Sequence, residues 1–126
     1  MPIMNNIILG EKLDINRYNE ILLLLNFSEY FTKEQLETDI TENGNSLSGG
    51  QIKLISLARA LYRGSSVLIM DELCANLDKK AIDNIKALII KLKETHILIL
   101  VEHVDSLDHL ADKVITLKGS NIIDVQ

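Results

Sequence analysis

The spacing of apolar residues predicts a mostly helical first half. Over 14–31 they recur at every third or fourth position, which is the period of one helix face. A shorter helix is expected over 33–37, and the stretch 39–46, which contains Asn and Gly, is predicted to be a loop. A long helix should then run over 49–62, because Gly64 provides a helix end.

The second half follows a different pattern. Two short, wholly apolar runs, 67–70 and 97–101, are typical of strands buried on both faces, and the segment 78–93 between them carries one apolar helix stripe. Strand, helix and strand in this order predict a parallel pair with a right-handed crossover. A short helix over 105–110 and a closing hairpin over 113–125 should follow. The predicted fold class is α/β, a helical part followed by a parallel-sheet core fragment with a C-terminal hairpin.

Composition narrows the class of protein. With 126 residues, of which 47% are hydrophobic, the chain can form one core that buries about two-thirds of its unfolded surface. The net charge of −5 argues against nucleic acid as a partner. The one cysteine, Cys74, fits a reducing compartment, and the apolar runs are too short to span a bilayer. A cytoplasmic location is therefore expected. Four aromatic residues at helical spacing are assigned to the core: Tyr18, Phe27, Tyr30 and Phe31.

The start of the long helix combines a cap with two glycines. Ser48 and Gln51 form the S-x-x-Q pattern of a capping box, in which the serine oxygen accepts a hydrogen bond from a backbone N–H of the first helical turn. Helix propensity does not explain Gly49 and Gly50, which are poor helix formers. The free N–H groups and the dipole of a helix start favour phosphate. Two interpretations stay open, a capped helix with a flexible start and an anion site.

Two adjacent acids, Asp71 and Glu72, follow the first predicted strand. The carboxyl ends of strands face the ligand crevice in open α/β sheets, and two neighbouring carboxylates favour a compensating metal ion or proton. Asp71 suits Mg²⁺ held through water, and Glu72 could polarise an attacking water. The alternative is a strand that ends in a solvated acidic turn.

The remaining polar candidates are weaker. His103 follows the second predicted strand and could donate to a phosphate oxygen or orient a water, although a histidine taken alone at such a place is more often an ordinary, partly buried one. Asp78 could cap the helix after it or face a partner protein. His96 and His109 are interpreted as structural. The spacing of the histidines and the one cysteine does not favour a zinc site.

Taken in order, these segments resemble the nucleotide-binding domain of ATP-binding cassette (ABC) transporters. Four motifs stand in the family's order and spacing: the signature motif LSGGQ at 47–51, the Walker B segment VLIMDE at 67–72, the D-loop ANLD at 75–78, and the switch histidine at His103. ARAL at 58–61 matches the helix after the signature. TDITENG at 38–44 and IMNNI at 3–7 resemble segments of the exporter branch.

The resemblance covers nearly the whole chain but only the second half of a cassette. No G-x-x-x-x-G-K-[ST] loop, the Walker A motif that cradles phosphates, occurs in the 126 residues, and it is expected ahead of residue 1 in the parent protein. The implied fold is a partial P-loop NTPase fold. Residues 1–64 would form the helical subdomain with the signature motif, and residues 65–126 the Walker B and switch-histidine half of the core. The sequence departs from the family pattern at Leu73, Cys74, Ile52-Lys53-Leu54, Thr41 and Asn43.

The resemblance implies a role for each motif. In the family two cassettes enclose two ATP molecules head to tail, with Mg²⁺. Asp71 would hold Mg²⁺, Glu72 would align water, and His103 would stabilise the transition state. A second set would serve the partner's ATP: Ser48, Gly49, Gly50 and Gln51 at the γ-phosphate, with Asp78 facing the partner. The implied partners are a second nucleotide-binding domain and transmembrane domains, at the cytoplasmic face of the membrane. The isolated chain is expected not to hydrolyse ATP.

Two other functions are open. One is a lobe of a chromosome-maintenance or double-strand-break-repair ATPase, against which the acidic charge and the absence of heptads before Ser48 argue. The other is a non-catalytic truncated cassette that lends its signature segment to another subunit. In the family's sheet the Walker A strand lies beside the strand that leads to His103. We therefore expect an unpaired edge there, with self-association or a shifted hairpin.

Overall fold

The computed structural model describes residues 2–37, 47–103 and 105–126, so the predicted loop 39–46 and the whole segment 38–44 lie outside the described residues. The helices and strands follow in the order α1 (Ile3–Ile8), α2 (Ile15–Leu24), α3 (Phe27–Tyr30), α4 (Lys33–Glu37), α5 (Gly49–Tyr62), β1 (Val67–Asp71), α6 (Lys79–Leu92), β2 (Ile97–Val101), the 3₁₀ helix η1 (Asp105–Leu110), β3 (Ile115–Lys118) and β4 (Asn121–Val125). This order confirms the predicted succession of a helical half and an α/β half.

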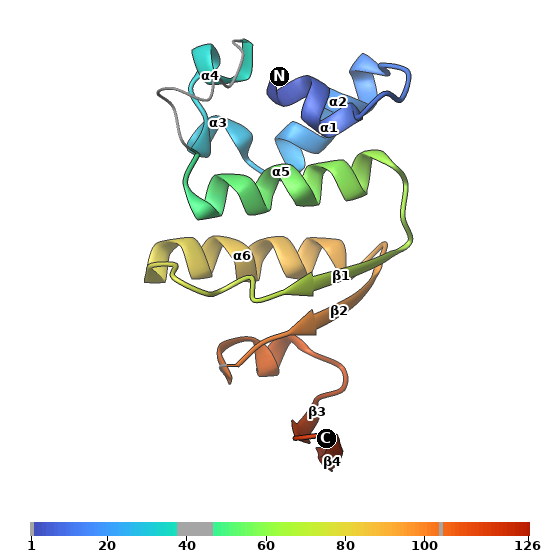
Figure 1. Ribbon diagram of the computed structural model, residues 1–126, viewed down its shortest axis with the longest axis vertical. Helices are drawn as coiled ribbons and strands as arrows, with labels where there is room; N and C mark the ends of the chain where they lie inside the picture. The colour runs from blue at the N-terminus through green and yellow to red at the C-terminus, as the bar shows by residue number, and fades with distance from the viewer. Residues whose placement is uncertain (1, 38–46, 104) are drawn as a thin grey trace.

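The elements form successive layers (Figure 1). The short helices α1 and α2 pack on α5, which lies between this helical cluster and α6. The strands β1 and β2 come next, and the β3–β4 hairpin lies at the far end of the molecule. One cluster of buried side chains runs from α1 through α5 to β1, α6 and η1, and the hairpin contributes none of its members. Within the described ranges no helix is long and apolar enough to cross a membrane.

The helix α1 was not predicted from hydrophobic spacing. It has only six residues, yet Ile3 and Ile7 are completely buried. Two apolar residues four positions apart lie on the same helix face, but a pattern this short does not distinguish a helix from a loop. Packing on α5 therefore decides the conformation of this segment.

The prediction of one helix over 14–31 is wrong, because the chain turns after Leu25. Asn26 adopts a left-handed backbone, with φ of 50°, and separates α2 from α3. Asparagine tolerates this conformation better than most residues with a side chain. After the turn, the rings of Phe27 and Phe31, four residues apart in and just after α3, stack with their centroids 4.7 Å apart. Leu25 and both rings become buried, so tertiary packing outweighs the continuous helical periodicity.

The expectation that both strands are buried on both faces is also wrong. β1 and β2 pair in parallel, with Leu68 opposite Leu98, and Leu68 is buried in the same cluster as Ile89 and Leu92 of α6. The other face is exposed: Ile69 is 71% exposed and Ile97 64% exposed. A wholly apolar run indicates a strand, but it cannot show which face a neighbouring element covers.

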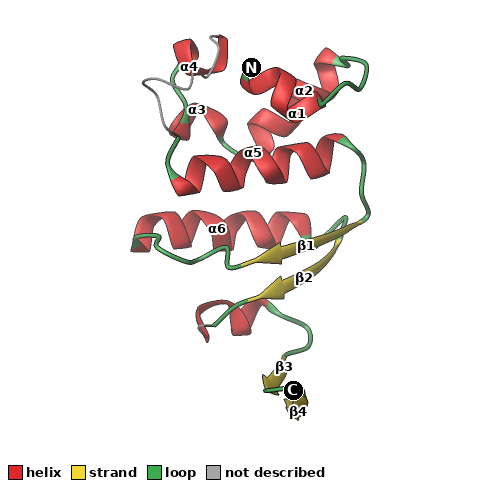
Figure 2. Cartoon of the chain, viewed as in Figure 1, coloured by secondary structure: helices red, strands yellow, loops and turns green. Residues whose placement is uncertain are grey.

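The closing hairpin is confirmed. β3 and β4 pair antiparallel around a turn in which Gly119 has φ of 61°, a conformation that favours glycine. They form a sheet of their own, separate from β1 and β2 (Figure 2). All of their residues are exposed, so the hairpin lies outside the core.

Candidate functional site

The capping box at the start of α5 is present. The Ser48 hydroxyl accepts a hydrogen bond from the backbone N–H of Gln51 at 3.2 Å, and the Gln51 side-chain oxygen accepts one from the backbone N–H of Ser48 at 2.9 Å. The Gln51 amide also donates to the backbone carbonyl of Tyr30 at 2.6 Å. Gln51 thus orients the helix start and ties it to α3.

The two glycines in this first turn have no packing reason to be glycine. Neither Gly49 nor Gly50 has a positive φ. A Cβ at Gly49 would meet no atom within 4 Å, and one at Gly50 would be at ordinary contact distance from Leu77 Cδ2, at 3.7 Å, and Ser48 Oγ, at 4.0 Å. Glycine costs roughly 0.5–1 kcal/mol relative to alanine inside a helix. The described residues therefore leave free space around two glycines that are unfavourable in a helix. A site where a ligand comes close to the backbone N–H groups would have these two properties.

The carboxyl ends of the two parallel strands bring Glu72 and His103 together. Glu72 directly follows β1, His103 lies two residues after β2, and the Glu72 N–H donates to the carbonyl of Val101 at 2.8 Å. Glu72 Oε1 lies 2.9 Å from His103 Nε2. Because an ionised carboxylate can only accept, Nε2 carries the shared proton. The side chains are 51% and 78% exposed, so both groups can be reached from solvent.

The turn after Glu72 is tightly held. Leu73 and Cys74 are buried, and the Cys74 N–H donates to Glu102 Oε1 at 3.3 Å. Burial raises the pKa of the Cys74 thiol, the Glu102 carboxylate raises this pKa further, and the ammonium groups of Lys53 and Lys86 lower it. A buried thiol with a raised pKa is a poor nucleophile, so Cys74 is interpreted as a packing residue.

Asp78 acts as a helix cap. Its Oδ1 accepts a hydrogen bond from the Ala81 N–H at 2.8 Å, at the start of α6. This is the first of the two roles that the sequence left open. The aspartate is exposed, so the cap does not bury it.

The arrangement of carboxylates limits what metal the chain could hold by itself. Asp71 ends β1 and is exposed, next to Glu72. Among the described residues no group of three or more His, Cys, Asp or Glu side chains could hold a metal ion. Mg²⁺ needs only one or two carboxylates when phosphate and water supply the other oxygens. Asp71 therefore fits a Mg²⁺ that arrives with a nucleotide.

The structure joins only some of the predicted site residues. Glu72 and His103 are in contact, whereas Ser48 to Gln51 belong to the start of α5. A residue noted in the sequence only as a departure from the family pattern connects the two places: Lys53, whose ammonium reaches the backbone of the turn after Glu72. No sequence signal identified this contact, because it joins positions 19 apart through tertiary structure.

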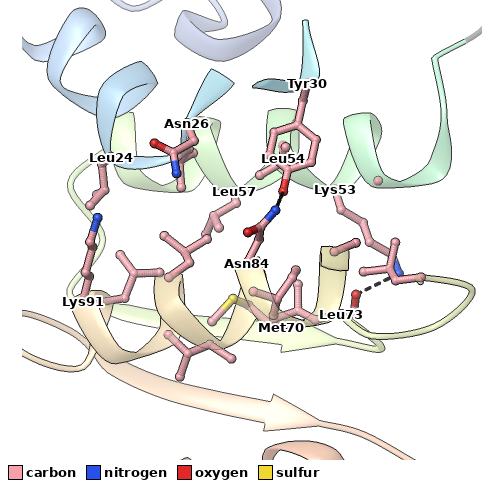
Figure 3. Close-up of a pocket in the computed structure, with 18 residues that line it drawn as sticks. Leu24, Asn26, Tyr30, Lys53, Leu54, Leu57, Met70, Leu73, Asn84 and Lys91 are labelled. Atoms are coloured by element: carbon pink, nitrogen blue, oxygen red, sulfur yellow. Dashed lines mark hydrogen bonds between the residues drawn. The ribbon is translucent and has the colours of Figure 1, made fainter. Parts of the chain in front are cut away.

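A cavity of about 70 Å³ lies between α5 and α6 (Figure 3). Its walls are mainly apolar, with Met70 of β1 and Leu73 from the turn after it on one side. At its edge the Asn84 amide donates to the Tyr30 hydroxyl at 2.9 Å. Glu72 and His103 are not among the residues that line it. The cavity is thus separate from the polar cluster at the strand ends.

Comparison with known proteins places this fold and site in a family. The family model for ABC transporters matches residues 9–75, slightly more than half of the chain. The chain therefore belongs to the ABC transporter family, as a nucleotide-binding domain of exporter type. The matched stretch contains Ser48, Gln51, Asp71 and Glu72 but ends before His103.

The chain is similar to several curated proteins. It is 31% identical over 126 residues to an ATP-dependent lipid A-core flippase of Francisella novicida, with 97% of this chain and 21% of that protein covered. It is 38% identical over 131 residues to the mesentericin-Y105 transport/processing ATP-binding protein of Leuconostoc mesenteroides, with 97% and 17% covered. The chain thus spans about a fifth of the length of these relatives.

A solved structure shows the fold. An ATP-binding cassette of an ABC transporter, crystallised in its ADP conformation, superposes with a TM-score of 0.75 at 21% identity, over 99% of this chain and 54% of that chain. The fold is therefore that of an ABC ATPase, represented by part of the cassette.

Proposed function

We propose that this chain is the C-terminal half of the ATP-hydrolysing domain of an ABC exporter. Residues 1–64 would form its helical subdomain and residues 65–126 the Walker B half of its core. The observation that carries the proposal is the contact between Glu72 and His103, 2.9 Å apart at the carboxyl ends of neighbouring parallel strands. In α/β folds this end of the sheet is where ligands bind.

Each residue near this contact would have a distinct task. Asp71 would hold Mg²⁺ through water; with ATP bound, the ion would offset negative charge on the phosphate oxygens. The Glu72 carboxylate would accept a hydrogen bond from a water molecule and direct its lone pair toward the γ-phosphate. His103 Nε2–H donates to Glu72 in this structure; with ATP bound, it would donate to a phosphate oxygen instead, which would free the Glu72 carboxylate for the water.

The start of α5 would serve the ATP of the partner subunit. Ser48 and Gln51 shape the helix start, and the open space at Gly49 and Gly50 supports close approach of an anion to the backbone N–H groups. Asp78 would lie toward the partner domain. The partners of the complete protein would be a second nucleotide-binding domain and the transmembrane domains, at the cytoplasmic face of the membrane. The 126-residue chain alone would not hydrolyse ATP, because it carries no Walker A loop.

The test is ATP hydrolysis by the complete cassette that contains this sequence. Glu72→Gln keeps the shape of the side chain and removes the carboxylate, so kcat should fall about 10²–10⁴-fold, the usual contribution of a general base. Glu94→Gln is the control: Glu94 is an exposed glutamate just after the end of α6, outside the proposed site, and the change should leave kcat unchanged. Equal kcat values for the Glu72→Gln variant and the unsubstituted cassette would contradict the proposal, as would turnover by the 126-residue chain alone.

A further inference from the structure

The turn after β1 has a backbone that needs outside support. Glu72 and Asn76 both adopt left-handed conformations, with φ of 53° and 59°. Asparagine tolerates this region, but a glutamate is disfavoured there, and such a conformation persists where surrounding contacts leave no alternative. From the strand side, the turn is held by the bond from the Glu72 N–H to Val101 and by the bond from the Cys74 N–H to Glu102.

The support from the helix side comes from Lys53. Its Nζ donates to the carbonyl of Glu72 at 2.6 Å and lies 3.4 Å from the carbonyl of Leu73 and 3.3 Å from that of Ala75. Figure 3 shows the side chain reaching from α5 to this turn. An ammonium has three donors and forms stronger hydrogen bonds than a neutral group. In the described parts of the chain Lys53 forms no ion pair with a carboxylate, so these carbonyl oxygens are its polar partners.

The same helix end contacts the same loop a second time. Leu77 lies against Gly50, where its Cδ2 would be 3.7 Å from an added Cβ. Lys53 follows Gly50 by three residues, a little less than one helical turn. The start of α5 and the loop after β1 are therefore neighbours, and the bond from Lys53 Nζ to the Glu72 carbonyl is the hydrogen bond that links α5 to the Glu72 backbone in the described residues.

We propose that Lys53 is a positioning residue that clamps the Glu72 turn to the signature end of α5. Through this clamp, the signature segment Ser48 to Gln51 and the Glu72 carboxylate would move together. The coupling of two ATP sites rests on the proposed function, whereas the contact between Lys53 and the turn is a property of the described fold.

Cys74 provides a direct readout of the clamp, because it is the only cysteine and is buried in this turn. The rate of its reaction with a maleimide reports how often the turn opens. In Lys53→Met the rate should rise at least about tenfold, as expected for loss of hydrogen bonds to a charged group. Loss of the Lys53 charge raises the pKa of Cys74 and by itself slows the reaction, so a faster reaction reports greater exposure of the thiol and not a change in its charge.

Two further variants complete the measurement. Lys53→Arg retains the charge and the donors and should restore a rate within about threefold of the original, since a guanidinium can reach the same carbonyl oxygens. Lys86→Met removes the other cation near Cys74 without touching the turn carbonyls, and its rate should stay equal or become slower. Unchanged reactivity in Lys53→Met, or an equal rise in Lys86→Met, overturns the proposal.

Hydrogen exchange separates the clamp from general stability. In Lys53→Met, faster exchange confined to residues 72–76 supports the clamp, whereas an equal increase throughout α5 and α6 shows only a structural role and overturns it. In the complete cassette, Lys53→Met should lower kcat for ATP and leave KM unchanged, because Glu72 is misplaced after binding. A cassette without ATPase activity refutes the proposed function and leaves the clamp standing. An active cassette in which Lys53→Met retains full kcat refutes the coupling.

Discussion

At the scale of single residues, the candidate site depends on a few directional contacts. Glu72 has a left-handed backbone, a histidine on its carboxylate and a lysine on its carbonyl. The capping box was predictable, because Ser48 and Gln51 are three positions apart and one helical turn brings them together. The clamp by Lys53 was not predictable from sequence spacing, because α5 and the turn are brought together only when the core packs.

The cap and the glycines of α5 should act on stability in opposite directions. Ser48→Ala removes the acceptor for the Gln51 N–H and should lower the free energy of unfolding by about 0.5–2 kcal/mol. Gly49→Ala enters open space in an ordinary helical conformation and should raise it by about 0.4–1 kcal/mol. Urea unfolding of the two variants measures both effects. Destabilisation by Gly49→Ala would contradict the free space found around Gly49.

At the scale of elements, the sequence predicted every helix of eight or more residues in the described structure, but it missed where α2 ends. The apolar spacing over 14–31 continues through Asn26, and only the burial of Phe27 and Phe31 explains why the helix stops there. α5 and α6 agree with prediction because each has its own cap and an uninterrupted apolar face.

Asn26 should tolerate glycine better than a branched residue. Its φ of 50° suits glycine, so Asn26→Gly should change the unfolding free energy little. Asn26→Val places a β-branched side chain in the left-handed region and should cost about 1–2 kcal/mol. Thermal unfolding followed by circular dichroism compares the two variants. Equal melting temperatures would mean that the break between α2 and α3 does not depend on this backbone conformation.

At the scale of the whole molecule, one face of the β1–β2 pair is apolar and exposed. Its members alternate along both strands: Val67, Ile69, Ile97, Ile99 and Val101. In the described part of the chain β2 pairs with β1 only, which leaves its second edge without a partner strand. Exposed apolar strands with a free edge promote association between chains.

We therefore expect the 126-residue chain to self-associate as its concentration rises. Ile99→Lys places a charge in the middle of the exposed face and should shift sedimentation toward the monomer. Leu23→Lys is a matched control, since Leu23 is 77% exposed on α2, away from the strands. A chain that stays monomeric at all concentrations, or an equal response to both substitutions, would contradict self-association through the exposed face of β1 and β2.

The sequence by itself determined what depends on neighbouring positions: the capped helices, the two apolar strands, the hairpin turn and the motifs that indicate an ABC cassette. Only the tertiary structure decided which strand face is covered, where the helix over 14–31 breaks, and that Glu72 meets His103 and Lys53. The reason is physical. Hydrogen-bonded turns and side-chain periodicity arise from residues a few positions apart, whereas burial and contact between distant residues depend on how complete elements pack.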